Sequence, residues 1–106
     1  MPQSVDKAAV VGEDKERLAC SFLERRGLRL VIRNYRCRRG EIDLVMRDAD
    51  TLVFVEVRFR RTSHYGTPAE TVDAHKQRRL AAAASHYLQQ HPSALPCRFD
   101  VLALSG

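Results

Sequence analysis

One stretch of the chain constrains its fold more than any other: Thr51–Arg60, which reads TLVFVEVRFR. Branched and aromatic residues dominate it, which is typical of a strand buried in a β-sheet. Because side chains alternate between the two faces of a sheet, Glu56 shares its face with Leu52 and Phe54. A carboxylate surrounded by apolar groups is unfavourable to bury without a compensating partner. The sequence therefore predicts that Glu56 has a specific role.

The preceding segment supplies a second carboxylate. Gly40–Arg47 (GEIDLVMR) alternates as a strand should, with Asp43 on the face opposite Ile42, Leu44 and Met46. Asp48–Asp50 has turn composition, which predicts that this strand and Thr51–Arg60 form a hairpin. With a suitable register, such a hairpin sets Asp43 close to Glu56.

The remaining segments predict an α/β fold in the order α-β-β-β-α-β. The predicted elements are a helix from about residue 6 to Arg26, a strand over Leu28–Tyr35, a basic loop over Arg36–Gly40, a loop over Arg61–Thr71, a helix from Asp73 to about Gln90, and a strand over Arg98–Leu104. The last strand follows a helical crossover, so we expect it to lie parallel to an earlier strand. We expect residues 1–106 to form one domain, with residues 1–5 as a loose end.

The charge of the chain favours a polyanionic partner. The formal net charge is +5, and all 18 basic residues except Lys7, Lys15 and Lys76 are arginine. Guanidinium groups bind phosphate in a bidentate fork, which suits nucleic acid, although a solvated basic surface is the alternative. No apolar run approaches the length of about 20 residues that spans a bilayer, and the N-terminal residues do not resemble a secretory signal. We therefore expect a cytoplasmic protein that does not enter a membrane.

Two neighbouring carboxylates in a small sheet repel each other and need compensation. A bound Mg²⁺ or Mn²⁺ held by Asp43 and Glu56 provides it, and salt bridges to Arg58 and its neighbours are the alternative. A metal ion next to arginines suits cleavage of a phosphodiester. Further arginines flank the two strands and are expected to form a basic rim that holds nucleic acid: Arg36, Arg38, Arg39, Arg60 and Arg61. The histidines of the second helix, His75 and His86, are expected on its surface.

Four blocks of the chain resemble one known family. GEIDLV, VFVEVRFRR, KQRRL and RFDVLAL are similar, in this order, to the YraN-like family of small bacterial proteins. That family belongs to the restriction-endonuclease-like PD-(D/E)xK superfamily and is close in layout to archaeal Holliday-junction resolvases. The resemblance implies a restriction-endonuclease-like fold, with a central mixed sheet flanked by helices.

The resemblance also implies roles for individual residues. Asp43 and Glu56 would be metal ligands, joined by the main-chain carbonyl of Val57 and by Glu13 on the first helix. Gln77 would be a polar residue facing the site, and Lys76 beside it would bind the nucleic acid. In the superfamily a lysine follows the second acidic residue by two positions, whereas this chain has Arg58. Arginine supplies charge but essentially never gives up its proton.

These features lead to three hypotheses. The first is a metal-dependent DNA endonuclease, selective for branched DNA, in which Arg58 contacts the scissile phosphate. The second is a non-catalytic nucleic-acid-binding module on a nuclease scaffold. The third is a structural partner in a DNA-processing assembly, recruited through the alanine run Ala81–Ala84, which is also a candidate seam for a homodimer.

Overall fold

The predicted order of elements is present in the protein. The computed structural model describes residues 15–60 and 73–105. Its elements are α2 (Lys15–Arg25), β1 (Arg29–Cys37), β2 (Gly40–Asp48), β3 (Thr51–Arg60), α3 (Ala74–Gln90) and β4 (Cys97–Ser105). Within the described ranges, no helix has the length and apolarity needed to cross a membrane.

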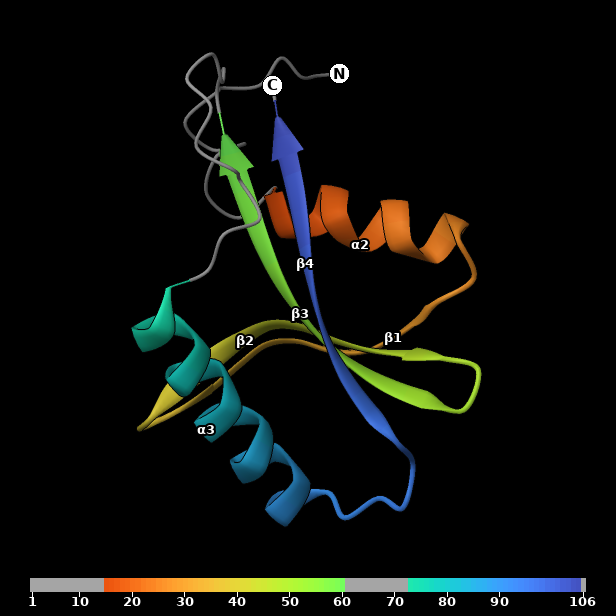
Figure 1. The fold of residues 1–106 in the computed structure, drawn as a ribbon. Helices are drawn as coiled ribbons and strands as arrows, with labels where there is room; N and C mark the ends of the chain where they lie inside the picture. Colours follow the sequence, from red (N-terminus) through yellow and green to blue (C-terminus); the bar gives the residue numbers. More distant parts are fainter. Residues whose placement is uncertain (1–14, 61–72, 106) are drawn as a thin grey trace.

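The strands form one mixed sheet in the order β1-β2-β3-β4. β1, β2 and β3 form an antiparallel meander, whereas β4 runs parallel to β3 at the edge of the sheet (Figure 1). The chain reaches β4 through α3, as the helical crossover predicted. The β2–β3 turn has Ala49 at φ +54°, and it is the tight hairpin connection that the Asp-Ala-Asp sequence indicated.

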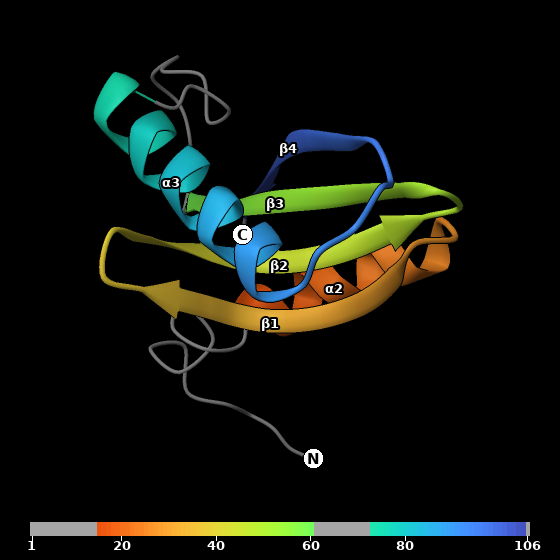
Figure 2. The ribbon, with the colours of Figure 1, turned by 90° about the horizontal axis from the view of Figure 1, so that it is seen from below.

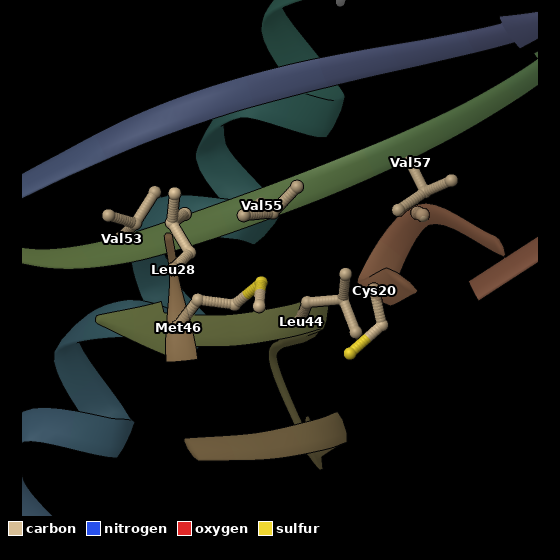
Figure 3. Close-up of a cluster of buried hydrophobic side chains, with 8 residues drawn as sticks. Cys20, Leu28, Leu44, Met46, Val53, Val55 and Val57 are labelled. Carbon is tan, nitrogen blue, oxygen red and sulfur yellow. The ribbon is translucent and has the colours of Figure 1, made fainter. Parts of the chain in front are cut away.

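The two helices cover opposite faces of the sheet (Figures 1 and 2). Ala19 and Cys20 of α2 pack on side chains of β2 and β3 that point to one face, among them Leu44, Met46, Val53, Val55 and Val57 (Figure 3). On the other face, α3 contributes Leu80, Ala83, Ala84 and Tyr87, which pack on Ile42, Val45, Leu52 and Phe54. β3 is therefore buried on both of its faces, which explains why its sequence is almost continuously apolar.

β1 and β2 differ from the predicted strands in two respects. Arg36 and Cys37 belong to β1, so the predicted basic loop is reduced to a tight turn at Arg38 and Arg39. The alternation of β2 also breaks at Asp43, because Ile42 packs on the α3 side whereas Leu44 packs on the α2 side. The sequence pattern had placed Ile42 and Leu44 on one face, and this expectation was wrong.

Candidate functional site

The site lies where β2 separates from β3. The two strands pair from Asp48↔Thr51 as far as Leu44↔Val55, and the pairing ends there. The next residue of β2, Asp43, uses its side chain instead: Oδ2 accepts a hydrogen bond of 2.7 Å from the Val57 main-chain N–H. The carboxylate thus occupies the position that a strand carbonyl would otherwise take, and it is held by the backbone of β3.

Opposite Asp43, β1 is distorted as well. Arg33 pairs with Leu44 and Tyr35 pairs with Ile42, so Asn34 lies across from Asp43, and it has φ +54°. Asparagine adopts this left-handed conformation more readily than most residues. The irregular backbone on both strands coincides with the change of face in β2, and together they present Asp43 at the opening of the sheet.

Glu56 reaches the same opening from β3. Its side chain is only 7% exposed, and Oε2 lies 3.0 Å from the Lys76 Nζ. Lys76 lies in the first turn of α3, where its main-chain N–H donates to Asp73, the N-cap of the helix. The cap fixes the start of α3 and with it the position from which the Lys76 side chain extends to Glu56.

Asp43 and Glu56 line one cavity of about 290 Å³ between the sheet and the start of α3. Its lining mixes charges of both signs and comprises Lys15, Glu41, Asp43, Glu56, His75, Lys76, Arg79 and Leu80. Acidic groups come from the strands, and all the lining residues of α3 except Leu80 are basic. A cavity of this kind can hold a cation at its carboxylates and a phosphate at its lysines and arginine.

Burial and mutual repulsion shape the protonation of the two carboxyls. Burial raises the pKa of Asp43, the Val57 N–H and Lys15 oppose the rise, and Glu16 adds to it. Burial also raises the pKa of Glu56, the Asp43 carboxyl adds to the rise, and Lys76 opposes it. Both groups therefore hold a proton to higher pH than isolated carboxyls do.

Sequence reasoning missed Glu16, a buried acidic residue in the first turn of α2. Its carboxyl is close enough to Asp43 to raise the pKa of that residue. A signal was present in the sequence, because Glu16 precedes the fully buried Ala19 by three residues and Cys20 by four. This spacing places Glu16 on the inner face of the helix, where a carboxylate needs a partner. Glu13, which the resemblance suggested for this role, lies outside the described residues.

The structure places the other expected site residues as follows. Val57 contacts Asp43 through its N–H, and Lys76 lines the cavity, but neither Arg58 nor Gln77 does. Arg58 and Gln77 each have an interaction partner of their own. Arg61 lies outside the described residues, as does the side chain of Arg60.

Arg36, Arg38 and Arg39 do not join the acidic cavity. They line a second cavity, together with Cys37 and His86, at the turn between β1 and β2. His86 was expected on the surface, but it is half-buried, and its Nδ1 is hydrogen-bonded to the Tyr35 hydroxyl at 2.5 Å. Three arginines of the expected basic rim thus line a cavity of their own.

The donor set of the acidic cavity fits a hard divalent cation. Within residues 15–60 and 73–105, no three His, Cys, Asp or Glu side chains form a group that could hold a metal by themselves. Mg²⁺ in proteins is commonly bound by one or two carboxylates, with water and substrate phosphate completing the shell. Asp43 and Glu56 meet this requirement, whereas a softer metal such as zinc would need nitrogen or sulfur ligands.

Comparison with known proteins shows the family to which the chain is similar. The model of a family described as "Uncharacterised protein family UPF0102" matches residues 15–104. A UPF0102 protein of Nitrosococcus oceani is 53% identical over 97 residues, which cover 90% of this chain and 78% of that protein. One from Pseudomonas savastanoi pv. phaseolicola is 50% identical over 108 residues, covering 100% of this chain and 86% of that protein. One from Chromohalobacter salexigens is 55% identical over 95 residues, covering 90% of this chain and 77% of that protein.

Proposed function

The chain belongs to the uncharacterised protein family UPF0102, the YraN-like family that its sequence resembles, and we propose that it is a metal-dependent phosphodiesterase acting on nucleic acid. One observation carries the proposal: Asp43 and Glu56, from neighbouring strands, line a cavity that also contains Lys76. Paired hard oxygen ligands beside cationic side chains suit the hydrolysis of a phosphodiester. DNA with branches or flaps is the substrate that the resemblance to resolvases suggests.

In this proposal Asp43 and Glu56 hold Mg²⁺ or Mn²⁺, with the Val57 carbonyl as a further ligand. When bound, such an ion polarises the scissile phosphate and lowers the pKa of a bound water. Glu16 acts as a positioning residue on the α2 side, because it is buried and interacts electrostatically with Asp43. The Val57 N–H fixes the same carboxylate from β3. Preorganised ligands of this kind lose little freedom when the cation binds.

Lys76 supplies the ammonium group that the Glu-x-Arg sequence of β3 lacks. Arg58 does not line the cavity, whereas the Lys76 Nζ lies within it, 3.0 Å from Glu56 Oε2. An ammonium at this position neutralises Glu56 when no cation is bound and can donate hydrogen bonds to phosphate oxygens. We therefore assign to Lys76 the stabilisation of negative charge on the phosphate, a role that the superfamily pattern gives to a residue of β3.

A second candidate function is nucleic-acid binding without turnover. It is favoured by the arginine at position 58 and by the small number of acidic ligands grouped within the described ranges. This function needs the cavity lined by Arg36, Arg38 and Arg39 but not the carboxylates of the acidic cavity. Substitution of Asp43 therefore separates the two functions.

The primary test is cleavage of linear, flapped and four-way DNA in the presence of Mg²⁺ or Mn²⁺. We expect D43N and E56Q to lower the cleavage rate at least about 100-fold, since each removes a metal ligand worth several kcal/mol in the transition state. D50N is the matched control, because the Asp50 side chain is 91% exposed at the far end of the hairpin. Binding of DNA without cleavage in either metal would contradict the enzyme and favour the second candidate.

The role of Lys76 is tested by K76M. This variant should cleave about 10-fold more slowly or worse, because charge on the phosphate is left without its ammonium partner. Its affinity for Mn²⁺, measured by calorimetry, should be equal or higher, because the ammonium no longer competes for Glu56. R78Q, an exposed change two residues further along α3, is the control. Unchanged cleavage by K76M would remove Lys76 from the site.

A further inference from the structure

A second cavity lies at the turn between β1 and β2, and it is as large as the acidic one, about 290 Å³. Its lining consists of Arg36, Cys37, Arg38, Arg39 and His86, so it contains no carboxylate. The two cavities have no lining residue in common. The acidic cavity combines carboxylates with basic groups, whereas the charged side chains that line this second, arginine cavity are all basic.

The positive charge of this arginine cavity is only partly neutralised. Arg36 Nε lies 3.4 Å from Glu41 Oε1, in an ion pair whose side chains are mostly exposed. Arg38 and Arg39 form no ion pair with any residue in the described ranges. Like charges gathered around a concave surface attract a counter-ion, and guanidinium groups bind phosphate oxygens in preference to most other anions.

The turn that carries these arginines is fixed on α3. Gly40 is buried, and a Cβ at this position would lie 2.2 Å from the Arg79 main-chain oxygen, so the turn and the helix are in direct backbone contact. On the other side of the turn, the bond between Tyr35 and His86 links β1 to the same helix. The arginines therefore extend from a backbone that is held in place, which reduces the ordering needed to bind an anion.

One ion pair separates the two cavities. Arg36 lines the arginine cavity, Glu41 lines the acidic cavity, and the two residues are cross-strand partners. A nucleic-acid strand with a phosphate in the acidic cavity would reach the arginine cavity by crossing this pair.

We propose that the arginine cavity is a phosphate subsite that holds the same nucleic-acid strand beyond the reacting phosphate. This inference rests on the proposed function, and it specifies a substrate that is long enough to extend over the β1–β2 turn. The subsite positions the strand and takes no part in bond cleavage.

Cys37 provides a reporter inside the subsite. It lines the cavity, whereas Cys20 is buried and Cys97 is exposed on β4. In the experiment, iodoacetamide alkylates the native protein in EDTA, and mass spectrometry follows Cys37 and Cys97 separately. We expect a twelve-nucleotide oligothymidylate to slow the alkylation of Cys37 at least fivefold and to leave that of Cys97 unchanged.

Variants separate the subsite from the reaction. The double variant R38Q/R39Q should lose the protection of Cys37, whereas D43N should retain it. Equal protection of both cysteines, or protection that survives in R38Q/R39Q, would overturn the subsite. Loss of cleavage with protection intact would overturn only the proposed enzyme. Retained cleavage of long DNA by R38Q/R39Q, with an unchanged KM, would overturn only the subsite.

Two further probes identify the source of the phosphate. An oligothymidylate without a 5′-phosphate should protect Cys37 as well as the phosphorylated form does, because the proposal places a backbone phosphate in the cavity. Protection that requires the 5′-phosphate, or that inorganic phosphate gives and the oligonucleotide does not, would contradict a strand crossing the turn. A melting curve of R38Q/R39Q within 2 °C or so of the native curve checks that the variant is folded.

Discussion

The two halves of β2 follow each other directly in sequence but differ in the strands with which they pair. From Leu44 to Arg47 the strand is paired on both sides, with β1 and with β3. From Gly40 to Ile42 it is paired with β1 alone, and Asp43 accepts a hydrogen bond from the Val57 N–H of β3. The paired half contributes Leu44, Val45 and Met46 to the core, and the separated half contributes Glu41 and Asp43 to the acidic cavity. The comparison shows that the candidate site is formed by opening the sheet rather than by adding residues to its surface.

The largest effect on stability is expected from the paired half. Leu44 is fully buried in the cluster beneath α2. L44A should lower the free energy of unfolding by about 3 kcal/mol, because it removes buried methyl groups and leaves a cavity. Urea denaturation measures the change, with V31A on the exposed part of β1 as control. If L44A loses less than about 1 kcal/mol, the paired half is not the rigid part of the strand.

A smaller effect on stability is expected where the separated half touches α3. G40A places a methyl group against the main-chain oxygen of Arg79, so the turn or the helix must move. We expect a loss of about 2 kcal/mol in urea denaturation and weaker protection of Cys37 by DNA, since the arginine cavity is displaced. R39A, at the exposed neighbouring position, should leave stability nearly unchanged. Equal stability of G40A and the native protein would show that the turn is not held by α3.

The smallest effect concerns pH. The folded-state pKa values of Asp43 and Glu56 are raised from ordinary values of 3.8 and 4.5. The folded protein therefore binds protons more tightly than the unfolded chain, and this stabilising contribution is lost as pH rises from these values through the raised ones. Relative to the native protein, D43N/E56Q should therefore gain free energy of unfolding as pH rises above 4 in the absence of metal.

The control for the pH effect is D48N/D50N, which changes two carboxylates on the same hairpin outside the cavity. Thermal melts in EDTA at a series of pH values give the comparison. The gain should disappear when Mg²⁺ is added, since the cation then compensates the native pair. A difference in melting temperature between D43N/E56Q and the native protein that does not vary with pH would contradict the raised pKa values.

Local patterns in the sequence were sufficient to predict most of the fold. Alternation and turn composition define β2, β3 and their hairpin, and Asp73 marks the start of α3, because these signals depend on neighbouring residues. The change of face at Asp43 was not predictable in this way. It depends on the end of the pairing with β3 and on the conformation of Asn34 in another strand.

The composition of the site was less predictable than the fold. Glu16 was missed because the pattern of α2 was assigned from its apolar residues, although a buried acid can share their face. Lys76 was expected to bind nucleic acid from the start of the second helix, where the resemblance places a polar residue facing the site. Its ion pair with Glu56 was not expected, because that contact depends on how α3 crosses the sheet. The arginines at the β1–β2 turn were expected around the acidic site. Arg36 and Cys37 instead extend β1, and Arg36, Arg38 and Arg39 line a separate cavity.

The parallel pairing of β3 with β4 has a consequence for the order of folding. The hairpin that brings Asp43 towards Glu56 is local in sequence, whereas β4 joins β3 only after α3 has crossed the sheet. Contacts between distant segments close later than local ones, so the acidic pair assembles before the edge strand docks. Until then the apolar β3 has an unpaired edge, which is a template for association with other chains. Aggregation during refolding should therefore originate at β3, the strand that also carries Glu56.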